Sequence, residues 1–353
     1  MEHSHDLQAV LDLMVRPAFA VSSGIVQYCN HAARQYMLSA DTPIDTLLKT
    51  GAEEYAAFTC GSLYLTLQVH GRLLDASVSP MSGFDVFVLD VPQEQPQLQA
   101  MALAARELRR PLSELMIAAD RILPAEGQND PNHQLLQRGL YQMLRLVSNM
   151  TDAASYAEQV PARQQLHDIP ALIAEVFEKA GVLAEHAGIT LRFTGYPQSV
   201  IALANPDKLE RAIYNMLSNA IKFSEAGGTV EASLTRRGDK LYLTVSDSGS
   251  GIPNDLMGNV FSMHLRQPGL EESRHGIGLG MLMIRSAASA HGGTVLIERG
   301  KTGGTRLTMT IAIRKDASGN LSSPKFHIDY AGGLDHGLME LSDVLPPSAY
   351  PSK

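Results

Sequence analysis

The sequence has little cysteine, no tryptophan and no long uncharged hydrophobic run in its 353 residues. Its two cysteines, Cys29 and Cys60, are too few for a disulfide scaffold and form no CxxC pair, which predicts a reducing, cytoplasmic setting. No stretch reaches the roughly 18 to 20 apolar residues that a membrane-spanning helix needs. The start, MEHSHDLQ, lacks the basic and then apolar order of a signal peptide. We therefore expect neither secretion nor membrane insertion.

A basic excess is also lacking, because 29 Lys and Arg residues face 37 Asp and Glu residues, for a net charge of -8. This balance argues against a nucleic-acid-binding protein. The acidic excess falls in residues 1–94 and 316–353, whereas residues 166–315 are slightly positive, which suits a polyanionic ligand. With 44% hydrophobic and 19% charged residues, the chain has the composition of a folded protein.

Hydrophobic patterning predicts an α+β protein of several domains. Residues 1–94 contain an amphipathic helix and five short strand patterns, which predict a small α+β module. Residues 95–165 contain two helical patterns, 98–123 and 133–157, each with one apolar stripe. A lone helical hairpin buries its stripes poorly, so we expect dimerisation into a four-helix bundle.

The second half of the chain changes pattern. In residues 166–315 helices and strands alternate, which predicts an α/β sandwich with a mixed sheet. Residues 316–353 are polar and rich in Gly, Ser and Pro, yet contain the apolar stretch FHIDYAGGLDHGLMELSDVLP. Disorder of this tail and its docking on another domain or a partner both remain open.

Three polar residues share one face of a helix predicted near residues 207–224. Asn215, Asn219 and Lys222 stand at i, i+4 and i+7. An amide oxygen is a hard ligand for Mg²⁺, and an ammonium group binds a phosphate oxygen, so the stripe suits a magnesium-bound phosphate group. Taken alone, it equally fits a solvated helix face.

Two glycine-rich segments follow. Asp247 ends a strand and precedes Gly249 and Gly251, which places a carboxylate beside a backbone that a flat ligand such as adenine can approach. Further on, HGIGLG opens a helix with its glycines at positions 276, 278 and 280, and the N-H groups of such turns bind phosphates. Each pattern alone also fits an ordinary turn, and the second lacks the Lys-Ser/Thr of a P-loop.

Four segments, taken together and in this order, resemble the nucleotide-binding boxes of sensor histidine kinases of two-component systems: NMLSNAIKFS, DSGSGIP, GIGLG and GGTRLTM. ARELRRPLSEL, residues 105–115, resembles their H box, and the N-terminal module resembles a PAS sensor domain. The resemblance implies a PAS-like module (1–94), a dimerisation hairpin (95–165), a Bergerat-type ATP-binding α/β sandwich (166–315) and a C-terminal tail (316–353).

The same resemblance implies ATP and Mg²⁺ as cofactors and assigns the residues around them. Asn219 would be the metal ligand, Asp247 would bind adenine, and residues from about Phe261 to His275 would form a lid over ATP. The residues implied to line the rest of the pocket are Asn215, Lys222, Gly249, Gly251, Gly276, Gly278, Gly280 and Thr305. In related ATPases a water-activating glutamate occupies the position of Asn215, so phosphoryl transfer is favoured over steady hydrolysis.

The H box departs from the family at its central residue. Arg106 stands where the phosphate-accepting histidine belongs, and a guanidinium stays protonated and is no nucleophile. The neighbouring base, Glu107, is retained, while Arg110 stands where relatives carry Thr or Asn. His133 lies beyond the hairpin loop, and His264, His275 and His291 belong to the ATP-binding region, so none is a good substitute acceptor; His291 is interpreted as a turn residue.

Two functions remain open. One is an ATP-binding pseudokinase that regulates a kinase or a response regulator by contact. The other is an active kinase that phosphorylates a histidine elsewhere, for example in trans on a partner chain. Both imply a homodimer or a heterodimer with another histidine kinase.

Overall fold

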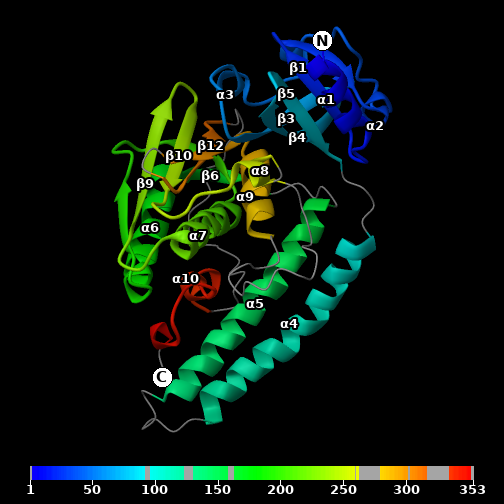
Figure 1. Ribbon diagram of the computed structural model, residues 1–353. Helices are drawn as coiled ribbons and strands as arrows, with labels where there is room; N and C mark the ends of the chain where they lie inside the picture. The colour runs from blue at the N-terminus through cyan, green and yellow to red at the C-terminus, as the bar shows by residue number, and fades with distance from the viewer. Residues whose placement is uncertain are drawn as a thin grey trace.

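The computed structural model describes residues 2–91, 96–122, 130–157, 163–258, 260–261, 279–300, 303–315 and 334–350. Figure 1 shows three bodies: an N-terminal module, two long helices side by side, and an α/β unit. The last described residues, 334–350, lie against the second of the long helices, residues 131–157. Within the described ranges no helix is both long enough and apolar enough to cross a bilayer.

The N-terminal module contains the five strands that the sequence predicts, joined by tight turns. Its turns at Ser23-Gly24, His70-Gly71 and Ser82-Gly83 have positive φ at both residues, the geometry that matches the twist of a hairpin. The stacked rings of Phe19 and Phe87, 4.7 Å apart, lie in its core. Its elements are α1 (Glu2–Asp12), β1 (Ala18–Ser22), β2 (Ile25–Cys29), α2 (His31–Arg34), η1 (Ile44–Thr46), α3 (Ala52–Ala56), β3 (Ser62–Val69), β4 (Arg72–Met81) and β5 (Phe84–Asp90).

The two predicted long helices are α4 (Pro96–Ile122) and α5 (Pro131–Ala157), and they pack against each other. Their shared core contains Leu112 and Met116 of α4 and Leu140, Leu144 and Val147 of α5. Each helix also keeps large apolar side chains exposed beside that core: Leu108, Leu115, Leu136 and Met143. The hairpin thus has exposed apolar side chains that its own two helices do not cover.

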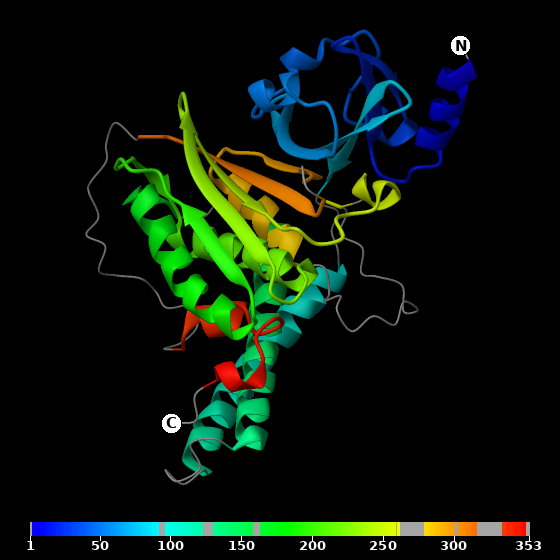
Figure 2. The same cartoon turned by 60° about the vertical axis from the view of Figure 1, so that its left-hand side comes forward.

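The α/β unit has a mixed sheet, as expected, with β7 parallel to β9 and the other strands antiparallel. Residues of β10 alternate between buried and half-buried, because helices pack on one face of the sheet (Figure 2). Its elements are β6 (Gln165–Asp168), α6 (Ile169–His186), β7 (Thr190–Thr194), β8 (Ile201–Ala204), α7 (Pro206–Phe223), β9 (Thr229–Arg237), β10 (Lys240–Ser246), α8 (Asn254–Met257), α9 (Leu279–Ala290), β11 (Val295–Arg299) and β12 (Thr305–Ala312). The short β6–β8 pair was not expected from the sequence, because four-residue strands carry too little periodicity.

One sheet of ten strands crosses from the N-terminal module into the α/β unit, in the order β2-β1-β5-β4-β3-β11-β12-β10-β9-β7. The junction pairs Tyr64 with Val295, Leu63 with Leu296 and Ser62 with Ile297. Gly61, just before this pairing, has a φ of +89°, and a Cβ there would lie 2.1 Å from the carbonyl oxygen of Ile297. Only glycine permits this approach.

Part of the tail docks on the rest of the chain, which was one of the two alternatives. Residues 334–350 form α10 (His336–Glu340) and the 3-10 turn η2 (Pro347–Ala349), which contact α5, α6 and α7. Tyr350 is fully buried in the core of the α/β unit. Residues 316–333 of the tail lie outside the described ranges.

Candidate functional site

Asp247 lies at the end of β10 and is held by backbone amides. Its Oδ1 accepts hydrogen bonds from the N-H of Gly249 at 3.0 Å and of Thr305 at 3.1 Å. Burial raises the pKa of Asp247, and the hydrogen bonds from Gly249 and Thr305 oppose that rise. A carboxylate fixed in this way is already oriented in the free protein. Binding a ligand to it therefore costs little side-chain entropy.

Glycines allow the backbone to close tightly around Asp247. A Cβ on Gly249 would lie 1.9 Å from the carbonyl oxygen of Phe223, the last residue of α7, and a Cβ on Gly304 would lie 2.2 Å from that of Asp247. Gly251, with a φ of +73°, stands against Gly304. The structure therefore brings together Asp247, Gly249, Gly251 and Thr305, and joins them to the C-terminal end of α7.

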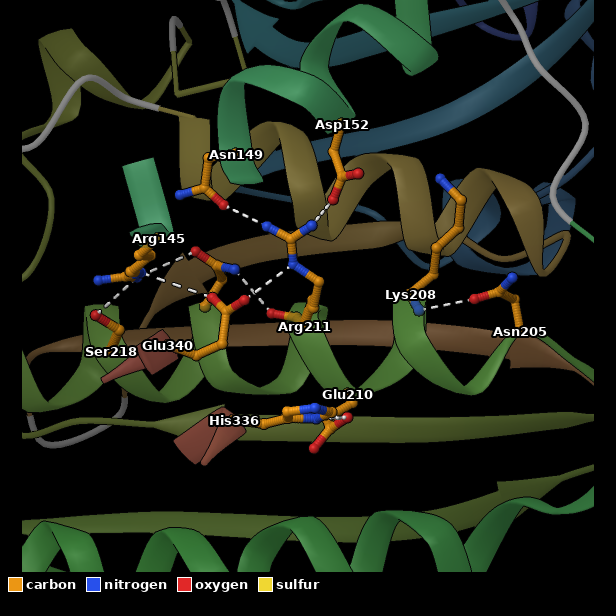
Figure 3. A network of polar contacts seen from close by, with 11 residues as sticks. Arg145, Asn149, Asp152, Asn205, Lys208, Glu210, Arg211, Ser218, His336 and Glu340 are labelled. Atoms are coloured by element: carbon orange, nitrogen blue, oxygen red, sulfur yellow. Dashed lines mark hydrogen bonds and ion pairs between the residues drawn. The ribbon is translucent and has the colours of Figure 1, made fainter. Parts of the chain in front are cut away.

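Helix α7 carries the predicted stripe of Asn215, Asn219 and Lys222. The side chain of Asn205 caps its N-terminus by accepting a hydrogen bond from the N-H of Lys208 at 2.8 Å (Figure 3). Asn219 and Lys222 are half-buried, and the Lys222 ammonium lies 5.9 Å from the ring centroid of Phe223. Both residues lie on the turns of α7 between Asn215 and the Asp247 cluster.

Asn215 is 1% exposed and both ends of its carboxamide are engaged. Its Nδ2 donates to the carbonyl oxygen of Arg211 at 2.8 Å, and its Oδ1 accepts from Nη2 of Arg145, on α5, at 3.3 Å. The structure thus places Asn215 against the hairpin. Gly280, at the start of α9, lies beside it, since a Cβ there would stand 2.9 Å from Asn215 Oδ1.

The other predicted residues lie away from Asp247 or outside the described ranges. Gly276, Gly278 and most of the expected lid fall in residues 262–278, which lie outside the described ranges. Arg106 and Glu107 are exposed on α4, whereas α5 is the hairpin helix that reaches Asn215. Arg110, also exposed, pairs with Glu114 one turn along α4 at 2.9 Å.

A network of buried charges at the hairpin was not expected from the sequence (Figure 3). The Arg211 guanidinium donates to Asn149 Oδ1 at 2.6 Å and also pairs with Asp152, both on α5. Arg145 donates to Ser218 Oγ at 3.3 Å, and both arginines pair with the carboxylate of Glu340 in α10. A helical wheel offers a partial signal, because Arg145, Asn149 and Asp152 recur at four- and three-residue steps on the face of α5 that meets α7.

Residues 204–315 match the family model described as Histidine kinase-, DNA gyrase B-, and HSP90-like ATPase. Curated relatives extend the likeness beyond that domain. The sensor histidine kinase TmoS of Ectopseudomonas mendocina is 32% identical over 211 residues, 58% of this chain and 22% of its own length. The adaptive-response sensory kinase SasA of Synechococcus elongatus is 28% identical over 231 residues, 56% of this chain and 54% of its own.

This chain is a homologue of two-component sensor histidine kinases. The sensor-like histidine kinase SenX3 of Mycobacterium tuberculosis is 25% identical over 334 residues, 88% of this chain and 80% of the relative. Other relatives are far longer: the chain spans 15% of hybrid signal transduction histidine kinase D of Dictyostelium discoideum and 22% of TmoS. Residues 204–315 are thus a histidine-kinase-like ATPase domain, and Asp247, Gly249, Gly251 and Thr305 lie inside the matched region.

Two solved structures align with parts of the chain. The mycobacterial sensor histidine kinase MprB aligns with a TM-score of 0.37 at 24% identity, over 44% of this chain and 100% of that chain. Full-length ShkA in complex with AMPPNP aligns with a TM-score of 0.49 at 23% identity, over 62% of this chain and 47% of that chain.

Proposed function

We propose that this histidine kinase homologue binds ATP and Mg²⁺ in its ATPase domain and acts in signal transduction as a pseudokinase that regulates by contact. The observation that carries the ATP site is Asp247, buried and held by two backbone N-H groups among glycines that leave no room for side chains. A fixed carboxylate beside bare backbone is suited to the exocyclic amine and flat ring of adenine.

The rest of the pocket follows from the position of α7. The half-buried carboxamide of Asn219 offers one oxygen to a metal ion, and Mg²⁺ takes its remaining ligands from phosphate and water oxygens. Bound Mg²⁺ would neutralise charge on the β- and γ-phosphates. Lys222 and Asn215 flank Asn219 on the same helix face, and the glycines at 276, 278 and 280 would offer backbone N-H groups to the phosphates.

The pseudokinase assignment rests on Arg106. A guanidinium has no neutral nitrogen to attack phosphorus at physiological pH, so Glu107 has no imidazole proton to accept. His133 and His291 are buried and engaged in structural contacts, which supports the view that neither of these two is a substitute acceptor.

The alternative is an active kinase that phosphorylates a histidine on a partner chain. Asn215, in the place where hydrolysing relatives carry a glutamate, favours this alternative over steady ATP hydrolysis, because an amide cannot take a proton from water. A response regulator would be a further partner under either function.

We also propose that the hairpin dimerises, with itself or with another histidine kinase. The exposed residues Leu108 and Leu115 stand seven residues apart on α4, as do Leu136 and Met143 on α5, and each is within four residues of a member of the hairpin core. A seven-residue apolar repeat is the pattern that packs helices into a bundle. The N-terminal five-stranded antiparallel module supports a PAS-like sensor role.

A fluorescent ATP analogue with Mg²⁺ tests the site. We expect binding by the natural chain and at least a tenfold loss of affinity in Asp247→Asn and Asn219→Asp. Asp239→Asn is the matched control, because it makes the same change on an exposed turn after β9. Equal affinity in all four proteins would count against the assigned pocket.

Radiolabelled ATP separates the two functions. The pseudokinase proposal expects no acid-labile, base-stable label on this chain, and such a label would overturn it. Label that appears only on an added histidine kinase partner, and disappears with Asp247→Asn, would establish the transfer alternative.

A further inference from the structure

The C-terminal segment, residues 334–350, belongs to two hydrophobic cores at once. Met339 packs in the hairpin core with Leu140 and Leu144. Leu338, Leu341, Leu345 and Tyr350 pack instead in the core of the ATPase domain. Because one short segment completes both cores, it joins the hairpin to the ATPase domain.

A buried carboxylate lies at the centre of this joint (Figure 3). Glu340 is 0% exposed, and its Oε1 accepts from Nε of Arg211 at 2.9 Å while its Oε2 lies 3.6 Å from Nε of Arg145. Arg211 belongs to α7 and Arg145 to α5, and both are almost fully buried. The Glu340 carboxylate therefore offsets part of the charge of two buried guanidinium groups, one from each neighbouring element.

Further polar contacts hold residues 334–350 against α5 and α7. Gln142 of α5 donates to the carbonyl oxygen of Ser342 at 3.0 Å. Asp343 pairs with Nη1 of Arg145 at 2.6 Å, and His336 of α10 contacts Glu210 of α7 at 2.9 Å. The segment is therefore held by side chains from the hairpin and from α7 together.

This arrangement reaches the proposed ATP site through Arg145. With Glu340 and Asp343 on its other nitrogens, the Arg145 guanidinium presents Nη2 to Asn215 and Ser218 of α7. The carboxamide oxygen of Asn215 accepts from Arg145 across the joint, whereas its nitrogen donates to the backbone carbonyl oxygen of Arg211 within α7.

We propose that residues 334–350 form an inhibitory brace, which holds the hairpin against α7 and keeps Asn215 from the nucleotide. This inference rests on the proposed ATP site. Nucleotide binding and docking of the brace then require different arrangements of α7. Each therefore weakens the binding of the other by the same factor. Release of the brace frees Asn215 and raises the affinity for ATP.

Glu340→Gln tests the brace in the full-length chain, because it keeps the shape of the side chain and removes the charge between two arginines. Two measurements are made: affinity for a fluorescent ATP analogue with Mg²⁺, and hydrogen exchange of peptides from residues 208–218 and 334–350. We expect at least tenfold faster exchange in both peptides and at least fivefold tighter nucleotide binding. In the natural chain, saturating analogue should also speed exchange of residues 334–350.

Glu175→Gln is the matched control, because it makes the same change in an exposed ion pair with Lys179 on α6, and it should alter neither measurement. Circular dichroism verifies that Glu340→Gln is folded, and Tyr350→Ala releases the same segment by a different route. The double variant Glu340→Gln/Asp247→Asn should lose the gained binding.

The outcomes separate this inference from the proposed function. Faster exchange without tighter binding in both variants would overturn inhibition by the brace while leaving the ATP site intact. Unchanged exchange in both variants would overturn the brace itself. Absence of nucleotide binding in every protein, released or not, would overturn the ATP site and with it the inhibitory role.

Discussion

The guanidinium of Arg285, in α9 of the ATPase domain, lies 2.8 Å from the carboxylate of Asp90, the last residue of β5 in the N-terminal module. Arg285 is 2% exposed, donates to the carbonyl oxygen of Phe261 at 2.6 Å and stands 5.0 Å from the ring centroid of Tyr64. One buried cation thus connects the end of the N-terminal module, its strand β3 and the ATPase domain.

Asp90→Asn should destabilise the folded chain by about 1.5–3 kcal/mol, because it removes a charged partner from a buried arginine. The measurement is the denaturant midpoint for unfolding. Glu114→Gln is the control, since it alters an exposed pair on α4 and should leave the midpoint unchanged. Equal midpoints for both variants would contradict a structural role for the Asp90–Arg285 pair.

Gly61→Ala and Gly71→Ala separate backbone strain from close packing. Both glycines have positive φ, but a Cβ on Gly71 meets nothing within 4 Å, whereas one on Gly61 collides with Ile297. We expect about 1–2 kcal/mol of destabilisation in Gly71→Ala from strain alone, and a further ~1–3 kcal/mol in Gly61→Ala from overpacking. Hydrogen exchange of β11 should rise only in Gly61→Ala; equal exchange in the two variants would argue against the β3–β11 junction.

His291 should make stability depend on pH. Burial, together with the charges of Lys208 and Arg314, lowers its pKa to about 4, and its ring bonds Ala287 and Asn205 in the neutral form. Between pH 6.5 and 4 the unfolded chain therefore binds a proton that the folded chain refuses, and stability falls as the pH falls. The loss amounts to roughly 3 kcal/mol over that window.

The denaturant midpoint at pH 7, 6 and 5 measures this effect. His291→Gln should be less stable at pH 7 but show a flatter decline toward pH 5. His31→Gln, an exposed control, should keep the slope of the natural chain. The same slope in all three proteins would show that the proton is taken up elsewhere.

Arg106→His should restore phosphorylation of the hairpin, because it supplies a neutral nucleophile beside Glu107. Acid-labile label from radiolabelled ATP is the readout, and it should disappear when Asp247→Asn is added. Arg109→His, on the same exposed surface of α4, is the control and should stay unlabelled. Absence of label in Arg106→His would place a second defect elsewhere in the chain.

The sequence predicted what depends on local pattern. The strands around Phe19 and Phe87, the two long helices and α7 all appear where periodicity predicts them, because each buries one face. The glycines beside Asp247 were also recognisable, since spacing along a strand end is local information.

What could not be predicted depends on partners far along the chain. Arg145, Arg211 and Glu340 look like solvated charges in the sequence, and only their pairing makes burial possible. His291 lies in a turn, as the sequence predicts, but its burial with both ring nitrogens bonded could not be predicted, because the backbone N-H of Asn205 comes from a distant part of the sequence. Position 61 requires glycine only because β11 pairs with β3, and that pairing could not be predicted from the local sequence.

The β3–β11 junction has a consequence for biosynthesis. Residues 47–50 already pair with the second half of β3, but Ser62, Leu63 and Tyr64 form an open edge until residues 295–297 are made, more than two hundred residues later. At translation rates of 5–20 residues per second, residues 62–64 of this edge stay unpaired for on the order of ten to fifty seconds. A nascent or truncated chain that ends before β11 therefore offers an open strand to other chains, and the newly made protein should depend on chaperones during that interval.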